Sequence, residues 1–583
     1  MDRLDLYLLK PTRYDDLGYP VQWWRSLIPS NSLACVAGIV QDAIDRQVLG
    51  ADVQIRSVVI DEVNAKIDPA RIIRETRRAG ARLLVFLVGV QSNQFPRAVD
   101  LARPFCAAGV QVCVGGFHVS GILSMLKDLP PDLIEAQAMG LSFFAGEAED
   151  GRIDEVIRDG YAGALKPIYN HVKDQPNLAG APLPLLPPAE IARNMSGYTS
   201  FDLGRGCPFE CSFCTIINVQ GRKSRFRTPD DLEAIIRTNA ANGIHKFFLT
   251  DDNFARNRNW EAFADRLIAL REEGLKAHLV IQVDTLAHKI PRFIDKCFAA
   301  GADQIFIGLE NINSDSLEGA KKRQNRVEDY REMFLAWKQH AVVIICGYII
   351  GFPNDTKESI LHDIAVIKQQ FPVDCLYLNY LTPLPGCEDH RKLHEAGAWM
   401  DPDMGKYDLN HRVTHHPRMS DAEWEEAYVA AHRSFYSWEH MNTVMKRMVA
   451  LRSHKPRMTV NRLLGYREAV RIEGVAKLES GVLRIRRRQQ RRHGLPVETP
   501  LVFYPKHWFK TGSALARMLL THTRLNLMMR HARRAKDRLA YTDAAISMDH
   551  AAESNDAFIA ETRVTSYADR RIHAAKAHAG ARD

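Results

Sequence analysis

Residues 204–214 have the sequence Gly204-Arg205-Gly206-Cys207-Pro208-Phe209-Glu210-Cys211-Ser212-Phe213-Cys214, which places three cysteines in a C-x3-C-x2-C array. Thiolates are soft ligands that suit zinc or iron-sulfur clusters, and a structural zinc would need a fourth Cys or His close by. No such ligand follows within short reach. A 4Fe-4S cluster held by only three cysteines leaves one iron open to a small molecule. The array therefore predicts a catalytic cluster, with a zinc knuckle or three buried thiols as the alternatives.

The same array resembles the signature of the radical S-adenosylmethionine (radical SAM) enzymes, because an aromatic residue, Phe213, directly precedes its last cysteine. The resemblance implies that Cys207, Cys211 and Cys214 are the catalytic cluster ligands. It also implies that the open iron binds the amino and carboxylate groups of S-adenosylmethionine (SAM), which an electron from the cluster cleaves to a 5'-deoxyadenosyl radical. Phe213 would lie near the adenine, and an electron donor such as a flavodoxin or ferredoxin would be a partner.

The composition is that of a globular protein. The chain has 583 residues, 46% of them hydrophobic and 25% charged, which suffices for about three or four domains and argues against a disordered or fibrous class. Ten cysteines, three of them in one array, do not make a disulfide framework, so we expect a reducing compartment. The first residues lack the pattern of a signal peptide, and apolar runs such as residues 342–350 are far shorter than the roughly 20 residues that span a bilayer. We therefore expect a cytoplasmic protein.

Residues 1–170 alternate between short apolar strands and amphipathic helices, which predicts parallel β-α-β units in a doubly wound, Rossmann- or flavodoxin-like sheet. Ligands of such sheets bind outside the carboxyl ends of the strands, where glycine-rich turns let a backbone come close. Two segments, residues 114–118 and 145–149, occupy such places. The expected strands are residues 6–9, 53–60, 83–88, 110–114 and 141–144.

The two turns resemble the G-G-x-H and G-E-x-E turns of the cobalamin-binding domain that precedes many radical SAM barrels. The resemblance implies that Gly115, Gly116, His118, Gly146 and Glu147 bind cobalamin. For His118 the alternative is a residue that caps the following helix. The chain has no D-x-H-x-x-G motif, so a bound corrinoid would lack a protein histidine on cobalt.

Prolines break any helix or central strand in residues 171–198, which we interpret as a linker. Residues 199–425 then repeat the alternation in about six β-α units, which predicts a partial or full (β/α) radical SAM barrel with its active site at the carboxyl ends of the strands. Residues 426–583 are expected to be mainly helical and basic. The predicted fold is therefore α/β with a helical C-terminal region, and the barrel strands are expected at residues 199–203, 245–250, 277–282, 304–309, 342–350 and 375–380.

Acidic residues follow two of the barrel strands. Asp251, Asp252 and Asn253 come after the second strand, where the family binds the SAM amino group, and carboxylates are suitable partners for an ammonium. Glu310 ends the fourth strand in a turn that resembles the family's G-x-E turn, which implies contact with the ribose or methionine part of SAM. The alternatives are a helix-capping turn for Asp251 and Asp252 and a surface position for Glu310.

Two basic segments lie near the C-terminus, residues 484–492 and 515–534. A basic amphipathic helix can lie on a membrane surface, and an arginine-rich run can bind nucleic acid. Solvated helix faces are the commoner explanation. We expect only weak, non-specific nucleic-acid binding, and we leave peripheral membrane contact open.

These features predict an enzyme that uses a 4Fe-4S cluster and SAM, with cobalamin as a further cofactor, for radical methylation, cyclisation or rearrangement of a small organic or lipid-like substrate. One alternative is an RNA-modifying methylthiotransferase-like enzyme, whose N-terminal domain would normally hold a second three-cysteine cluster. Only Cys35, Cys106 and Cys113 are available for one here. A non-catalytic iron-sulfur redox protein is the third class, and the SAM-like turns argue against it.

Overall fold

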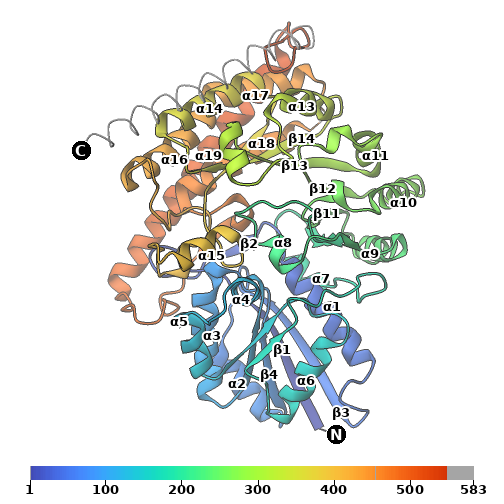
Figure 1. The fold of residues 1–583 in the computed structure, drawn as a ribbon, viewed down its shortest axis with the longest axis vertical. Helices are drawn as coiled ribbons and strands as arrows, with labels where there is room; N and C mark the ends of the chain where they lie inside the picture. Colours follow the sequence, from blue (N-terminus) through green and yellow to red (C-terminus); the bar gives the residue numbers. More distant parts are fainter. Residues whose placement is uncertain (1, 454, 548–583) are drawn as a thin grey trace.

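The computed structural model describes residues 2–453 and 455–547, which form two six-stranded parallel sheets and a C-terminal region beside them (Figure 1). The first sheet has the order β3-β1-β4-β5-β6-β7, which is flavodoxin-like over its first five strands. This confirms the predicted doubly wound sheet. The short strand β7 was missed. The strands are β1 (Asp2–Lys10), β3 (Val53–Asp61), β4 (Arg82–Leu87), β5 (Gln111–Gly115), β6 (Leu141–Ala145) and β7 (Ile168–Asn170).

Alternation along β1 explains why both faces of this sheet are covered. Leu4, Leu6 and Leu8 point into one apolar core, whereas Tyr7 and Leu9 point into the other. Helices α1 and α6 bury the first face, and α2 to α5 bury the second. The helices are α1 (Asn31–Asp45), α2 (Pro69–Arg78), α3 (Phe95–Ala107), α4 (Phe117–Met125), α5 (Pro131–Ala138) and α6 (Arg152–Ala162).

The second sheet is a partial barrel whose order is β15-β14-β13-β12-β11-β8, with β8 and β15 at its edges. All six predicted strands are present, and helices α9 (Pro229–Ala241), α10 (Trp260–Glu272), α11 (Phe293–Ala300), α13 (Tyr330–Lys338) and α14 (Lys357–Gln370) lie between them in the chain. Before β8 comes a single turn of helix, α7 (Pro188–Ile191). The strands are β8 (Tyr198–Phe201), β11 (Lys246–Leu249), β12 (His278–Val283), β13 (Ala302–Glu310), β14 (Val343–Ile350) and β15 (Cys375–Tyr380).

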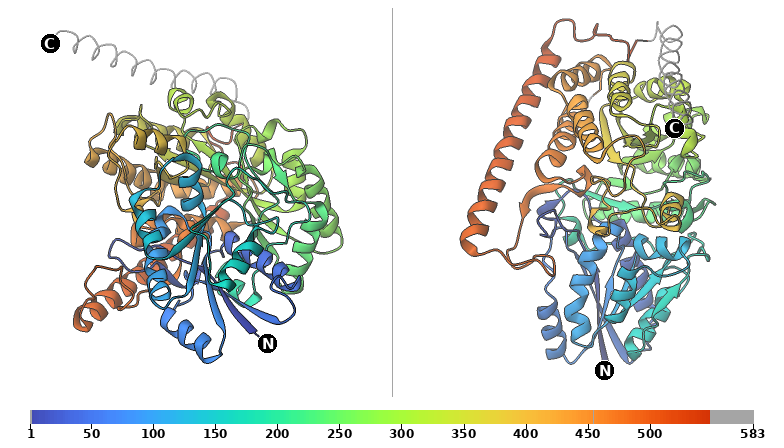
Figure 2. Two further views of the ribbon diagram at one scale, coloured as in Figure 1. Left: turned by 60° about the horizontal axis from the view of Figure 1, so that its bottom comes forward. Right: turned by 60° about the vertical axis from the view of Figure 1, so that its left-hand side comes forward.

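The C-terminal region is mainly helical, as predicted, and consists of α16 (Asp421–Phe435), α17 (Trp438–Ala450), α18 (Pro456–Glu473) and α19 (Pro500–Arg534). It also contains a strand that sequence reasoning missed. This strand, β16 (Gly481–Ile485), pairs antiparallel with β2 (Gln22–Ser26) and so joins the two ends of the chain. Helix α19 runs along one side of the molecule (Figure 2). Residues 548–583, the end of the predicted C-terminal region, lie outside the described part of the chain.

In the described ranges, 2–453 and 455–547, no helix is both long enough and apolar enough to cross a membrane.

Candidate active site

The cysteine loop follows the two-residue strand β9 (Gly204–Arg205) and ends at α8 (Ile216–Val219). Cys211 is buried, and Cys207 and Cys214 are half-buried. Burial raises the pKa of Cys207 to about 11 and that of Cys214 to about 12. These two thiols are therefore protonated at neutral pH, and their binding to a cluster as thiolates would release protons.

The three thiols fit an iron-sulfur cluster better than a single metal ion. Cys211 is close enough for its charge to raise the pKa of both Cys207 and Cys214, and all ten cysteines of the chain are free. Yet in the described residues no three His, Cys, Asp or Glu side chains converge on one ion, as a zinc site would require. A 4Fe-4S cluster binds each thiolate through a different iron, so its ligands stand apart.

Two distant segments hold the cysteine loop in place. Ser212 donates from its amide to the carbonyl of Ala320, 3.0 Å away, and from its hydroxyl to Asp389 of α15 (Glu388–Glu395), 3.1 Å away. Gln324 donates to the sulfur of Cys211 across 3.4 Å. Gln324 and Asp389 are contacts that no local motif in the sequence could reveal.

Phe213 and Glu310, both predicted to contact SAM, are brought together by a third residue, Lys322. The Lys322 ammonium lies 2.5 Å from a Glu310 carboxylate oxygen and 5.8 Å from the centre of the Phe213 ring. Glu310 has a φ of 63°, a strained left-handed conformation at the end of β13. Gly308 leaves room for this pair, because a Cβ there would lie 2.6 Å from the Glu310 carboxylate.

The three residues after β11 have different surroundings. Asp251 is buried and accepts hydrogen bonds from the amide of Leu203 (2.7 Å) and from Asn257 (3.0 Å), and burial raises its pKa to about 6. Asn253 donates to Asp284 across 2.8 Å. Asp252 alone of the three lines a cavity. Asp251 and Asn253 therefore shape the turn, and Asp252 is the residue that can meet a ligand.

That cavity is polar, has a volume of about 360 Å³ and lies between the two sheets. One wall is the carboxyl edge of the first sheet, at the ends of β1 and β4 where the strand order reverses. The other wall includes Arg205, Thr250 and Asp252 of the barrel. Lys10 is the last residue of β1. Its ammonium lies in this cavity and donates a hydrogen bond to the carbonyl of Gly89 across 2.6 Å. Burial lowers the pKa of Lys10 to about 8.

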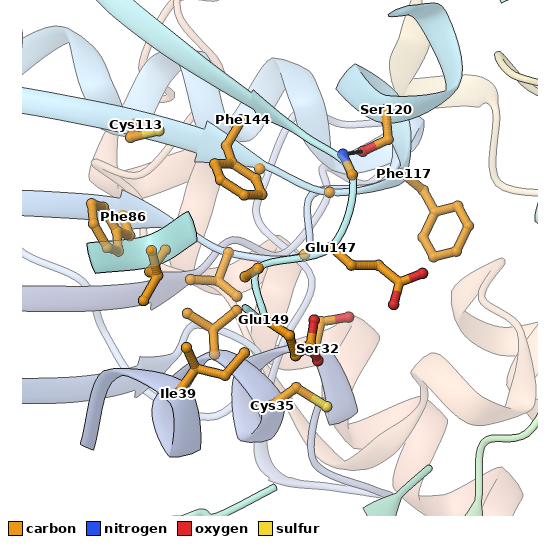
Figure 3. A pocket seen from close by; sticks show the side chains of 18 of the residues that line it. Ser32, Cys35, Ile39, Phe86, Cys113, Phe117, Ser120, Phe144, Glu147 and Glu149 are labelled. Carbon is orange, nitrogen blue, oxygen red and sulfur yellow. Dashed lines mark hydrogen bonds between the residues drawn. The ribbon is translucent and has the colours of Figure 1, made fainter. Parts of the chain in front are cut away.

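A second, apolar cavity of about 170 Å³ lies beside the first, between α1 and strands β4 to β6 (Figure 3). Gly115, Gly116, Gly146 and Glu147 line it, as the predicted cofactor contacts should. The glycines serve the protein's own packing, however. A Cβ on Gly116, whose φ is 146°, would lie 2.2 Å from the amide nitrogen of Val90, and one on Gly146 would lie 2.7 Å from the main chain after β7.

His118 does not line either cavity, contrary to its predicted role as a cofactor contact. Its ring is fully buried, packs against Phe95 with centroids 4.3 Å apart, and lies 3.2 Å from both Ser92 and Asp132. Helix α4 directs this side chain toward α5 rather than toward the sheet edge. None of the residues that line the two cavities is a histidine.

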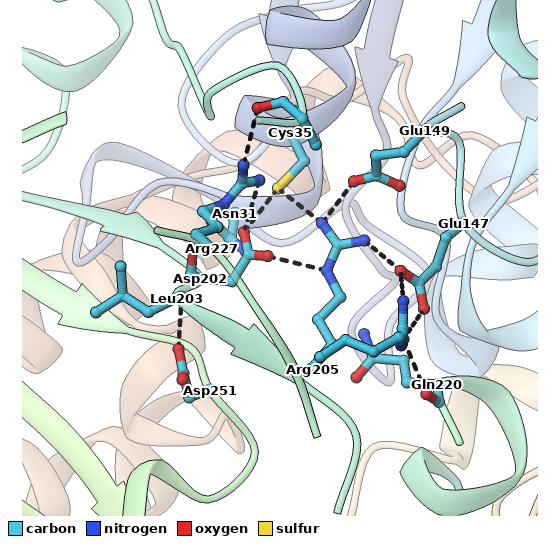
Figure 4. A network of polar contacts seen from close by, with 12 residues as sticks. Asn31, Cys35, Glu147, Glu149, Asp202, Leu203, Arg205, Gln220, Arg227 and Asp251 are labelled. Carbon is cyan, nitrogen blue, oxygen red and sulfur yellow. Dashed lines mark hydrogen bonds and ion pairs between the residues drawn. The ribbon is translucent and has the colours of Figure 1, made fainter. Parts of the chain in front are cut away.

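Glu147 also has a structural role, in a buried ionic network between the two sheets (Figure 4). Arg205 forms ion pairs with Glu147 (2.6 Å), Glu149 (2.7 Å) and Asp202 (2.9 Å), and Arg225 forms a second pair with Glu147. Arg205 precedes Cys207 by two residues. The network therefore ties the turn after β6 directly to the cysteine loop.

Two side-chain amides border both cavities, those of Asn31 and Gln220. The Oδ1 atom of Asn31 and the Oε1 atom of Gln220 are buried and have no hydrogen-bond partner among the described residues. Buried acceptors are normally satisfied. These two oxygens are therefore suited to accept hydrogen bonds from a ligand that carries amide donors.

Residues 202–367 match the model of the radical SAM superfamily. The matched segment begins just before the cysteine loop and covers most of the second sheet. The chain therefore contains a radical SAM domain, and enzymes with this domain use a 4Fe-4S cluster and SAM as cofactors. Cys207, Cys211 and Cys214 are the described residues that fit that cluster.

Characterised relatives cover much of the chain. A bacteriochlorophyllide d C-8(2)-methyltransferase of Chlorobaculum tepidum is 26% identical over 61% of this chain and 78% of its own length. A hopanoid C-2 methylase of Rhodopseudomonas palustris is 24% identical over 49% of this chain and 54% of its own. The solved structure of the cobalamin-dependent SAM radical enzyme OxsB, with aqua-cobalamin and SAM bound, has a TM-score of 0.52, is 12% identical and covers 96% of this chain and 84% of its own. At that identity the likeness shows the fold.

The N-terminal cysteines do not form a second cluster site. Cys113 packs in the core under α1, whereas Cys106 lies against the core on the opposite face of the sheet. Cys35 contacts Asp202 across 3.2 Å. This separation removes the feature on which an RNA-modifying methylthiotransferase-like enzyme would depend.

Proposed function

We propose that the chain is a cobalamin-dependent radical SAM methyltransferase that acts on a small organic or lipid-like substrate. The observation that carries the proposal is the polar cavity between the carboxyl edge of the first sheet and the strand ends beside the cysteine loop. A cofactor held on that edge would face the cluster across the cavity. The methyltransferase relatives support methylation over cyclisation or rearrangement.

The chain's own residues suggest how the cofactors would be held. Cys207, Cys211 and Cys214 would bind the cluster, and Asp252 and Glu310 would contact SAM. When bound, the cluster supplies the electron that cleaves SAM, and cobalamin supplies a methyl carrier. The partnerless acceptors of Asn31 and Gln220 match the amide groups around a corrin ring, and the apolar cavity beside them has room for a flat aromatic base.

Other residues would position these groups. Lys322 forms an ion pair with Glu310, which holds the carboxylate beside the cysteine loop. Arg205 fixes the distance between the sheet edge and the loop. The Lys10 amine can hold or release a proton near neutral pH, which would suit it to orient a polar substrate in the cavity.

We also propose a one-electron donor, such as a flavodoxin or ferredoxin, as the partner that reduces the cluster. Free thiols and a reducible cluster both suit a reducing compartment, for which the cytoplasm is our proposal.

Anaerobic turnover without a known substrate tests the proposal. Protein with a reconstituted cluster is incubated with SAM and reductant, with and without hydroxocobalamin. We expect S-adenosylhomocysteine only when cobalamin is present, because loss of a methyl group from SAM leaves that product. We expect 5'-deoxyadenosine in both cases. If bound cobalamin produced no S-adenosylhomocysteine, methyl transfer would be excluded and a radical rearrangement or cyclisation would take its place.

A further inference from the structure

Helix α19 exposes an unusual number of large apolar side chains. Leu501 is 88% exposed, Phe509 80% and Trp508 73%, and further along Leu520 is 73% and Leu519 65% exposed. Single exposed apolar residues are common, but a continuous set on one element marks an interaction surface. The helix runs along the outside of the molecule (Figure 2), so this surface is accessible over its length.

The charge of α19 is of one sign. Its 35 residues include no Asp or Glu. The helix itself therefore carries no negative side chain, which favours an anionic surface as its partner. The basic residues are Lys506, Lys510, Arg517, Arg524, Arg530, Arg533 and Arg534.

The apolar and basic residues form separate stripes. Leu501, Trp508 and Leu515 recur every seven residues, which is close to two helical turns, and so lie in one row. Lys510, Arg517 and Arg524 recur at the same spacing, but their row lies about 160° around the helix from the first row, beyond the exposed Val502, Phe509 and Leu520. The remaining face packs inward through Phe503, Thr521, Leu525 and Met529. An apolar stripe bordered by basic residues is typical of helices that lie in a membrane interface.

Part of the basic row also contacts the protein. Arg517 forms an ion pair with Glu468 at 3.1 Å, and its side chain is 44% exposed. Arg524 lies 3.9 Å from the centre of the Trp438 ring. These contacts fix the helix on the body of the molecule, while Lys510 is half-buried and forms no ion pair in the described ranges. The other basic segment, residues 484–492, is different, because Arg484, Arg486 and Arg492 are engaged with acidic residues of the chain.

A cavity of about 730 Å³ lies directly beneath α19. Its apolar walls include Leu515 and Met518 of α19, Leu464 of α18 and Trp23 of β2. Its polar end carries Lys477 and Arg462. Within the described chain neither of these two forms an ion pair, and Arg462 donates instead to the amide oxygen of Gln304 at 2.6 Å.

The cavity shares a wall with the polar cavity of the active site. Trp23 and Leu27, in the segment around β2, line the cavity beneath α19. Ser26 and Ile28 of the same segment line the polar cavity. The strand pair β2 and β16 thus separates the cavity beneath α19 from the polar cavity of the active site.

We propose that α19 docks the protein on an anionic lipid bilayer through its apolar and basic stripes, and that the cavity beneath it receives the hydrocarbon chain of an acidic lipid, whose head group meets Lys477 and Arg462. A second copy of the chain fits this surface less well, because two basic helices would repel each other. Nucleic acid would leave the leucines of the apolar stripe uncovered. The proposal does not depend on the reaction that the enzyme catalyses.

Vesicle flotation with the full-length, cluster-loaded protein tests the docking surface. We expect binding to vesicles of phosphatidylglycerol and phosphatidylcholine, and weak binding to phosphatidylcholine alone. The double variant Trp508→Ser/Phe509→Ser should lose roughly tenfold in affinity, because it removes the exposed aromatic anchors. Trp399→Ser is the matched control, since Trp399 is 45% exposed and lies outside α19. Equal vesicle binding by the double variant and the control would overturn the docking surface. So would dimerisation of the protein through α19, or binding to RNA instead of to vesicles.

Binding of a fluorescent long-chain fatty acid tests the cavity separately. Ala514→Phe places a ring in the cavity and should weaken binding roughly tenfold, since it fills the space of the chain. Lys477→Gln should weaken binding of the acid but not of the alcohol of equal length. Thermal unfolding and iron content show whether each variant is folded. If the wild-type protein bound no acid, or if Lys477→Gln affected acid and alcohol alike, the lipid site would be wrong.

Discussion

Arg205 illustrates, at the scale of single residues, how this site depends on contacts far apart in the sequence. Its guanidinium is buried among Glu147, Glu149 and Asp202. Burial alone raises the pKa of Asp202, but Arg205 and Arg227 outweigh it and hold that pKa well below its usual range. The carboxylates are thus stable in the interior only while the arginines are present.

Arg205→Met should therefore destabilise the protein strongly. Removing one partner of a buried ionic network leaves uncompensated charge and costs about 3–5 kcal/mol in the free energy of unfolding. Arg237→Met is the control, because Arg237 pairs with Glu233 and Glu273 on the surface and should change the unfolding midpoint little. Urea unfolding measures both. Equal midpoints for the two variants would show that the network does not hold the sheets together.

The three cluster cysteines give the second prediction. The variant with Cys207, Cys211 and Cys214 replaced by alanine should lose the 4Fe-4S cluster, since no other cysteine triplet has this spacing. Cys387→Ala should keep it, because the buried Cys387 sulfur accepts a hydrogen bond from the amide of His390 and caps α15. Iron and sulfide analysis with electron paramagnetic resonance measures the cluster. Undiminished cluster content in the triple variant would refute the assignment.

Asp251 and Asp252 are adjacent but should respond differently to substitution. Asp252→Asn should weaken SAM binding by roughly tenfold, because a charged partner of the SAM ammonium becomes neutral. Asp251→Ala should instead lower stability by about 1–3 kcal/mol, since it leaves the buried amide of Leu203 without an acceptor. Equilibrium dialysis with SAM and thermal unfolding distinguish the two effects. A loss of SAM affinity in the Asp251 variant alone would reverse our assignment.

At the scale of elements, sequence periodicity predicted most of the fold. Eleven strands were expected from apolar runs, and together with the missed strand β7 they form the two parallel sheets. Strands β2 and β16 were missed because each is short and depends on a partner more than 450 residues away, as between Trp23 and Arg484. The cysteine loop was predictable because its chemistry lies in adjacent residues. The roles of Lys10, Lys322 and Gln324 were not predictable from the sequence, because only folding brings these residues to the site.

His411 links two such distant segments and makes stability depend on pH. It lies 2.9 Å from Asp408 and 3.2 Å from Asp16 in the N-terminal segment. Burial lowers the pKa of His411, but the two carboxylates outweigh burial and raise that pKa from 6.5 to about 10. Between these values the folded state binds more protons than the unfolded state. The stabilisation is therefore complete below pH 6.5 and is lost as the pH rises toward 10.

The melting temperature of the wild-type protein should accordingly fall more steeply than that of His411→Gln between pH 6.5 and 10. Differential scanning fluorimetry over this range provides the measurement. The comparison with the variant cancels the other groups that titrate there. Parallel curves for the two proteins would mean that His411 is not held as a cation in the folded state.

At the scale of the whole molecule, the first sheet lies below the partial barrel (Figure 1). The polar cavity is lined by residues of both parts. The C-terminal region closes one side of this assembly through the pair β2 and β16 and carries α19 on its outside (Figure 2). The arrangement suits two cofactors that must act on one substrate.

Titration of the cluster-loaded protein with hydroxocobalamin tests the central proposal most directly. The visible absorption spectrum reports binding, and electron paramagnetic resonance of the reduced complex reports the ligand below cobalt. We predict one cobalamin per chain with no protein histidine on cobalt, because no histidine lines the two cavities. Absence of binding at tens of micromolar, or nitrogen coupling from a protein histidine, would contradict the proposed corrinoid site.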